Sequence, residues 1–200
     1  MTLIHVTANF IKLYYTIIVF NALWQKKNYE GAAKIMRHLL RLDPKFFIYH
    51  EVLAEMYINI GYLGEATDTL AQATKIDGTY AKFYYLMGKV QVLRKDYASA
   101  ISQFKRALAY NPLSMSSLCY LATIYNLEER KETTQLLAHF DLKYHNNTEG
   151  EAIFNNKIVA LLHTNAAPDI IQSLVNQAHT IRPSSLLIQE LYTQLGSLRV

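Results

Sequence analysis

Histidine and cysteine are the residues of this sequence best suited to bind a metal ion or to act as a nucleophile. There are seven histidines and one cysteine, Cys119. His139 and His145 stand six residues apart, a spacing that does not place both side chains cleanly on one face of a helix. Cys119 would need a neighbouring base to become a nucleophile. We therefore expect no metal site, and we interpret Cys119 as a small apolar residue on a helix.

Motifs that bind zinc, a phosphate or a dinucleotide do not occur in the sequence. The chain lacks H-E-x-x-H, G-x-S-x-G, G-x-G-x-x-G and a phosphate-binding glycine loop. Each of these motifs places a nucleophile, a base or backbone amides where a substrate or cofactor needs them. We predict a protein that is not an enzyme, uses no cofactor and works by binding.

The composition favours a folded helical protein. Hydrophobic residues make up 51% of the 200 residues and charged residues 18%, which is enough apolar material for a continuous core. Four prolines and seven glycines are few for a loop-rich β protein of this length. The charge alternates, with +5 over residues 1–46, −4 over 47–80 and +5 over 81–114. Nucleic acid prefers a continuous basic stripe, so this pattern suits a protein partner with its own charge pattern.

A period of 34 residues runs through the middle of the chain. Three series share it: Ala32, Ala66 and Ala100; Met36, Leu70 and Phe104; and Pro44, Gly78 and Pro112. A fourth series has a large residue followed by a small one: Leu53-Ala54, Met87-Gly88 and Leu121-Ala122. Small residues allow two helices to approach closely, and proline or glycine ends a helix. The period therefore predicts pairs of packed helices.

These residues resemble the consensus of the tetratricopeptide-repeat (TPR) family, whose repeat is a pair of antiparallel helices, A and B. The best single match is residues 81–114, with Gly88, Tyr97, Ala100 and Pro112 at consensus positions. The resemblance implies an all-α fold, a right-handed α-solenoid of about four to five repeats with a C-terminal capping helix. It also implies a scaffold, adaptor or chaperone-like protein that holds a protein segment in a concave groove lined by the A helices.

The period divides the chain into repeats. We expect an N-terminal extension over residues 1–12, followed by four repeats at 13–46, 47–80, 81–114 and 115–148. The fourth repeat loses the pattern in helix B, where Thr134 and Asp141 stand in place of alanine. Beyond a polar stretch the register slips by three residues, and 149–200 would hold a degenerate fifth repeat and the capping helix.

The predicted groove is a stripe on each A helix, about half a turn from the face that packs inward. By the resemblance it contains Tyr14, Asn21 and Trp24; Glu51, Glu55 and Ile58; Lys82, Tyr85, Lys89 and Val92; and Cys119 and Thr123. Lys82 and Lys89 would pair with acidic side chains of the partner. The alternative is that part of the stripe packs against a neighbouring helix.

The carboxylate clamp of co-chaperone TPR domains is not expected. This clamp captures a C-terminal carboxylate with lysine, asparagine and arginine side chains on successive A helices. Aligned from the first repeat, its positions hold Ile17, Asn21, Val52, Lys82 and Leu86. Only Asn21 and Lys82 match the clamp, and an alignment from the second repeat retains neither.

The stretch over residues 10–24 is apolar, and its only charge is Lys12. The uncharged run over residues 13–25 is shorter than the roughly 20 residues of a membrane-spanning helix, so it predicts a buried helix. The alternative is a contact with a membrane or another chain, including a second copy. The protein would then be a structural subunit of a larger, membrane-associated assembly. The single cysteine is compatible with the cytoplasm, where we place the protein, at a membrane periphery in the alternative.

Overall fold

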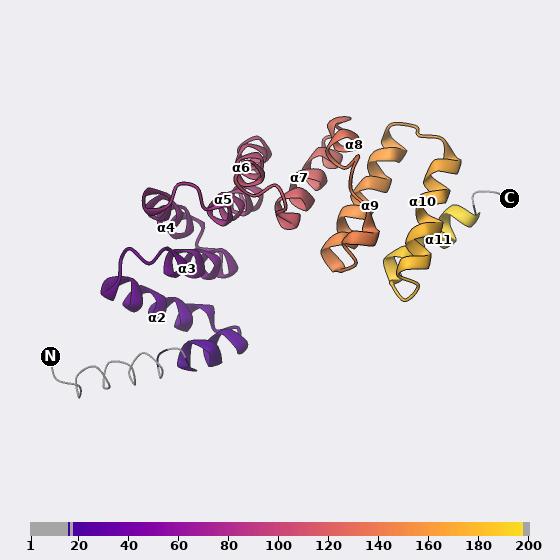
Figure 1. The fold of residues 1–200 in the computed structure, drawn as a ribbon. Coiled ribbons are helices and arrows are strands. Elements are labelled where there is room, and N and C mark those ends of the chain that lie inside the picture. The colour runs from indigo at the N-terminus through magenta and orange to yellow at the C-terminus, as the bar shows by residue number, and fades with distance from the viewer. Residues whose placement is uncertain (1–15, 17, 198–200) are drawn as a thin grey trace. The chain divides into compact units, whose positions relative to one another are not determined.

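The computed structural model of the protein describes residue 16 and residues 18–197, and in this part of the chain the regular structure is helical, without a strand (Figure 1). The chain divides into two compact units, Met1–Tyr110 and Asn111–Val200, which we call the N-terminal unit and the C-terminal unit. Tyr14 and the extension predicted over residues 1–12 lie outside the described residues. The all-α fold predicted from the period is confirmed.

Helices of similar length make up the N-terminal unit. Residues 18–25 are helical, and five helices follow: α2 (Tyr29–Leu42), α3 (Phe47–Ile60), α4 (Leu63–Ile76), α5 (Ala81–Leu93) and α6 (Tyr97–Tyr110). Within this unit α3 packs against α4 and α5 against α6, and further contacts join α2 to α3 and α4 to α5. The pair α3 and α4 lies within residues 47–80, and the pair α5 and α6 within 81–114.

Small residues stand where the two helices of a pair meet. Ala54, Ala66 and Ala100 have no exposed surface. Gly88 shows why size matters here, because a Cβ atom added to it would lie 2.5 Å from a ring carbon of Phe104. Phe104 is itself fully buried and fills the space that the glycine leaves. The close approach of α5 and α6 therefore depends on pairing the smallest residue with a large one.

A recurrent turn joins helix A to helix B. One residue in each turn has a left-handed backbone, with φ from 52° to 83°: Lys27, Gly61, Lys95, Glu129 and Asn165. The amide of the following residue donates to the carbonyl five residues before it, at 2.8–2.9 Å in all five turns. This bond is the mark of a Schellman-type helix end, which favours glycine at the left-handed position. Only one of the five is glycine, so the turn was not apparent from the sequence.

The C-terminal unit departs from this regularity. It contains α7 (Met115–Leu127), α8 (Glu132–Leu136), the 3-10 turn η1 (Leu142–Tyr144), α9 (Thr148–His163), α10 (Pro168–Ile181) and α11 (Leu186–Ser197). α8 has 5 residues, where α4 and α6 have 14 each. The chain then passes close to the start of α9, since a Cβ atom on Gly150 would lie 1.8 Å from the carbonyl oxygen of His145.

Candidate protein-binding site

The predicted groove residues fall mainly on three A helices. These are α3 with Glu51, Glu55 and Ile58; α5 with Lys82, Tyr85, Lys89 and Val92; and α7 with Cys119 and Thr123. Asn21 and Trp24 belong to the helical residues 18–25, and Tyr14 lies outside the described residues. Because α3 and α5 pack against each other within the N-terminal unit, their two stripes adjoin.

Two ammonium groups on α5 gather around one aromatic ring. The Nζ atom of Lys82 lies 4.9 Å from the ring centre of Tyr85, and that of Lys89 lies 5.7 Å from it. Spacings of three and four residues put these side chains on one face of the helix. Within the described part of the chain, neither lysine forms an ion pair with a carboxylate. Two like charges therefore share one ring, an arrangement that an incoming anion would stabilise.

Burial shifts the protonation equilibrium of Lys89. Loss of water around the ammonium group lowers the pKa of Lys89, the carboxylate of Glu55 opposes this effect, and the charge of Lys82 adds to it. A carboxylate bound between the two lysines would favour their charged forms. We therefore expect the pKa of Lys89 to rise when an acidic group binds.

α3 presents acidic groups beside this basic surface. The hydroxyl of Tyr80 donates to Oε2 of Glu51 at 2.8 Å. Burial and this hydrogen bond raise the pKa of Tyr80 to about 12. Glu51 is thus already engaged within the protein, whereas Glu55 acts on the charge of Lys89. We call the surface formed by Glu51, Glu55, Lys82, Tyr85 and Lys89 the α3–α5 face; it is acidic on one side and basic on the other.

Some of the predicted groove residues contribute to packing. Ile58 is only 6% exposed and belongs to the core of the N-terminal unit. The ring centre of Trp24 lies 6.1 Å from that of Phe20 and 5.4 Å from that of Tyr29, so the indole is largely covered. The reason is that an A helix is covered on two sides, as α3 is by α4 and by α5. Of the remaining residues, Val92 is half-buried and Asn21 is exposed.

In the C-terminal unit, α9 contacts the predicted residues of α7. The side-chain amide of Asn156 on α9 donates to Oγ1 of Thr123 at 3.1 Å and lies 4.0 Å from the sulfur of Cys119. Asn126 in turn donates to Oδ1 of Asn156 at 2.9 Å. Burial raises the pKa of Cys119, a hydrogen bond with Thr123 lowers it in part, and the charge of Glu149 raises it. The thiol therefore stays protonated near neutral pH, which makes it a poor nucleophile.

Asn156 is a contact residue that the repeat pattern did not single out. It stands on α9, beyond the point where the register of the repeat slips. The available signal was an asparagine pair, residues 155–156, between the apolar pairs 153–154 and 158–159 of α9, because polar groups in such a place need hydrogen-bond partners.

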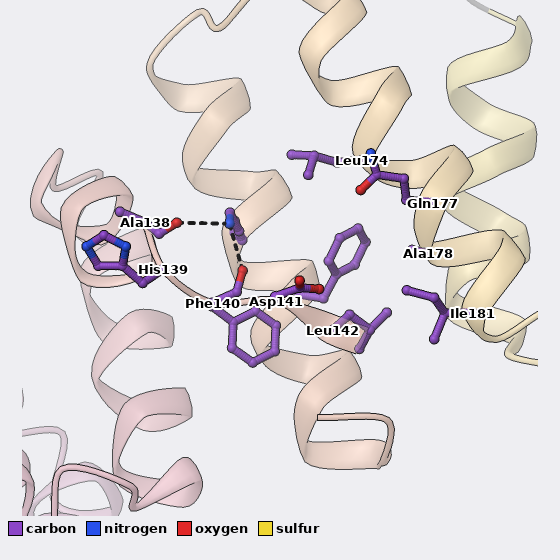
Figure 2. Close-up of a pocket in the computed structure, with 11 residues that line it drawn as sticks. Ala138, His139, Phe140, Asp141, Leu142, Leu174, Gln177, Ala178 and Ile181 are labelled. Carbon is purple, nitrogen blue, oxygen red and sulfur yellow. Dashed lines mark hydrogen bonds between the residues drawn. The ribbon is translucent and has the colours of Figure 1, made fainter. Parts of the chain in front are cut away.

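A cavity of about 270 Å³ lies within the C-terminal unit, between residues 138–142, α9 and α10 (Figure 2). Buried side chains line its floor, namely Leu142, Phe154 and Ala178. Exposed side chains stand at its rim, namely His139, Asp141 and Gln177. Figure 2 shows Leu174 and Gln177 extending from α10 toward the segment that carries Asp141. Apolar and polar side chains thus share the lining of the cavity.

Lys157 ties the residues after α8 to α9. Its ammonium group donates to the carbonyl oxygen of Phe140 at 2.8 Å and to that of Ala138 at 3.4 Å (dashed lines in Figure 2). Burial lowers the pKa of Lys157, and the carboxylate of Asp141 opposes this effect. Carbonyl groups beyond the end of a helix need partners from elsewhere. Lys157 supplies the partner that a longer α8 would have provided from its own backbone.

Metal ligands do not cluster in the part of the chain that the structure describes. No group of three or more His, Cys, Asp and Glu side chains there is placed to hold a metal ion. None of the described helices is both long enough and apolar enough to cross a bilayer.

Two segments of the chain match the family model described as Tetratricopeptide repeat, residues 21–46 and 81–112. The second coincides with the repeat that matched the consensus best in the sequence. Among curated proteins, the Hsp70-Hsp90 organizing protein of Triticum aestivum is 26% identical over 92 residues. These residues are 46% of this chain and 16% of that protein, so the match spans a small part of the longer relative.

Solved structures of TPR proteins share the fold. A tetratricopeptide repeat protein from Parabacteroides merdae has a TM-score of 0.69 at 13% identity, over 91% of this chain and 71% of that chain. YrrB, described as a TPR protein with an unusual peptide-binding site, has a TM-score of 0.58 at 17% identity, over 88% of this chain and 89% of that chain. Two segments of the chain thus match the family's repeat model, and the predicted TPR fold is confirmed.

Proposed function

We propose that this chain binds a segment of another protein on the α3–α5 face. Acidic side chains of the segment would lie against Lys82 and Lys89, with Tyr85 as the aromatic contact between them. The observation that supports this most is the pair of half-buried ammonium groups around one ring, with no carboxylate in an ion pair with either. TPR repeats serve as protein-interaction scaffolds, and the similar protein YrrB has a peptide-binding site.

The acidic side of the α3–α5 face would set the orientation of the bound segment. Glu55 is half-buried on α3 and acts on Lys89, so a basic residue of the segment would complement it. A segment with one basic and one acidic residue would therefore bind in one orientation. Such complementarity contributes to specificity and to the association rate more than to affinity, which the ring of Tyr85 and other apolar contacts would supply.

Recognition of side chains fits this chain better than capture of a chaperone C-terminus. Of the clamp positions, Leu86 is fully buried in the N-terminal unit, and Val52 has no polar group. Asn21 and Lys82 remain, which is too few to bind both oxygens of a terminal carboxylate. We therefore propose an adaptor for internal acidic segments, even though the curated relative is an Hsp70-Hsp90 organizing protein.

The test compares two double variants of equal charge. The intact chain, Lys82→Glu/Lys89→Glu and Lys75→Glu/Lys105→Glu are used to capture partners from a native extract, which are then identified by mass spectrometry. Lys75 and Lys105 are exposed on the B helices α4 and α6, so the second variant has the same net charge without altering the α3–α5 face. A partner lost from the first variant only, with helicity unchanged, supports the proposal. Partners that bind all three proteins equally would contradict binding on the α3–α5 face.

A second candidate function is that of a structural subunit held through the apolar N-terminal stretch. Ile18 and Val19 are 45% and 48% exposed, and Val19 borders a hollow lined also by Ile35 and His38. Exposed apolar side chains suit a contact with another chain or a membrane surface. A chain shortened to begin at Gln25 that keeps its solubility and oligomeric state would contradict this candidate.

A further inference from the structure

The cavity beside α8 lies where two residues differ from their counterparts in the preceding repeat. In α6, Phe104 and Ala107 are fully buried within a complete helix B. The residues 34 positions later are Ala138 and Asp141, which are both exposed and both line the cavity. The two buried residues of α6 thus have a small and a charged residue as their counterparts after α8, and neither counterpart is buried. The space left over is about 270 Å³.

Hydrogen-bonding capacity remains on two oppositely charged groups at this cavity. Lys157 has three N–H donors, and the carbonyl groups of Ala138 and Phe140 use two of them. Oδ1 of Asp141 accepts from the amide of Lys143 at 2.9 Å, and its other oxygen has no partner among the described residues. A cation would be repelled by Lys157 and an anion by Asp141. A neutral hydroxyl group, which both accepts and donates, complements this pair.

The size and lining of the cavity narrow the choice of ligand. Small-molecule sites usually measure about 300–1,000 Å³, so this cavity suits a single large side chain better than a free ligand. The apolar walls of Phe154, Leu174 and Ile181 favour an aromatic ring. Tyrosine combines such a ring with a hydroxyl, and it is enriched among the residues that anchor protein interfaces.

We propose that this cavity is a docking pocket for a tyrosine side chain of a partner protein. The ring lies against Phe154, Leu174 and Ile181, and the hydroxyl accepts from Lys157 and donates to Asp141. This pocket belongs to the C-terminal unit and the α3–α5 face to the N-terminal unit. The two proposals are therefore independent and can fail separately.

The probes for this pocket are N-acetyl-tyrosinamide and N-acetyl-phenylalaninamide, titrated into the intact ¹⁵N-labelled chain and followed by NMR. We expect saturable shifts confined to residues 138–142 and the parts of α9 and α10 that line the cavity. The tyrosine probe should bind roughly 2- to 10-fold more tightly, because the phenylalanine probe leaves the two polar groups without a ligand. The Lys82→Glu/Lys89→Glu variant should bind the tyrosine probe as the unchanged chain does.

Two substitutions separate pocket binding from surface binding. Ala178→Leu fills the cavity and should abolish saturable binding, whereas Ala109→Leu on the exposed surface of α6 should not. Asp141→Asn keeps an oxygen for the amide of Lys143 but removes the charge, so it should reduce the preference for tyrosine without unfolding the unit. Equal affinity for the two probes or the absence of a saturable shift would overturn the proposal. Unchanged binding by Ala178→Leu and Asp141→Asn would overturn it as well.

Discussion

Helix B is complete as α6 in the N-terminal unit and short as α8 in the C-terminal unit, although the 34-residue period extends into both. Residues 135–138 are Gln, Leu, Leu and Ala, all good helix formers, so local propensity does not explain why α8 ends at Leu136. What differs is the packed layer, in which Phe104 and Ala107 give way to Ala138 and Asp141. Tertiary packing, more than propensity, therefore decides how far helix B extends.

The two units also differ in the surface they offer to a partner. The α3–α5 face of the N-terminal unit carries charges around an aromatic ring on two regular A helices. The corresponding residues of α7, Cys119 and Thr123, are engaged by Asn156. The C-terminal unit instead has a cavity, which exists because helix B is short. Regular repeats thus present side chains on a surface, and the irregular repeat presents a pocket.

The largest expected difference between the units is at Phe104 and Ala138, which are 34 residues apart. Phe104→Ala should lower the free energy of unfolding by about 3–5 kcal/mol, because it empties a fully buried site beside Gly88. Ala138→Ser should change it by no more than about 0.5 kcal/mol, since Ala138 is exposed. Urea denaturation followed by circular dichroism measures both. Equal effects would show that the two positions are packed alike.

Substitution by leucine should affect stability differently at Ala107 and Ala178. Ala107 is fully buried in a filled layer, so Ala107→Leu should cost about 1–3 kcal/mol through overpacking. Ala178 lines the cavity, so the extra methyl groups of Ala178→Leu have room, and no loss of stability is expected. Thermal unfolding of the two variants side by side tests this. A comparable loss in both would mean that the cavity cannot accept a side chain.

The turn between helix A and helix B occurs in both units, and substitutions in it should have a smaller effect on stability. Lys95 has φ of 62°, which is unfavourable for a residue with a Cβ atom, whereas Gly61 occupies the same place one repeat earlier with φ of 83°. Lys95→Gly should therefore stabilise the chain by about 0.5–1 kcal/mol, and Gly61→Lys should destabilise it by a similar amount. Urea denaturation checks the signs. A destabilising Lys95→Gly would show that the lysine side chain compensates for the backbone.

The smallest expected effect is a pH dependence at Tyr80. Its pKa is raised from 10.0 to about 12, so the protonated form is favoured in the folded state. The stability from this group is complete below pH 10 and is lost as the pH rises through about 12. Ultraviolet titration should show a late-ionising tyrosine signal that Tyr80→Phe reduces and that Glu51→Gln shifts to lower pH. A Glu51→Gln profile identical to that of the unchanged chain would contradict the role of Glu51.

The fold could be predicted from the sequence because small residues recur at one period. Ala54, Ala66 and Ala100 recur where helices meet, and the structure buries all three completely. The best consensus repeat, residues 81–114, forms the pair α5 and α6. Spacing within one helix also brought Lys82, Tyr85 and Lys89 to one face correctly, because a helix has a fixed geometry.

The rest of the candidate site depends on contacts between helices, which a single period does not encode. Ile58 and Trp24 pack inward because two neighbours cover an A helix. Asn156 and the cavity lie where the register has changed, so no position-by-position comparison pointed to them. Lys157 is the clearest example, since its role depends on carbonyl groups 17 and 19 residues earlier that a complete helix would have bonded itself.

The most direct test of the binding proposal is isothermal titration of a captured partner segment against the intact chain, Lys82→Glu/Lys89→Glu and Lys75→Glu/Lys105→Glu. We predict that the first double variant weakens binding by at least about tenfold and that the second leaves it unchanged. Replacing the acidic residues of the segment by lysine should restore its affinity for the first variant. Equal affinity of the segment for all three proteins would contradict recognition by the α3–α5 face.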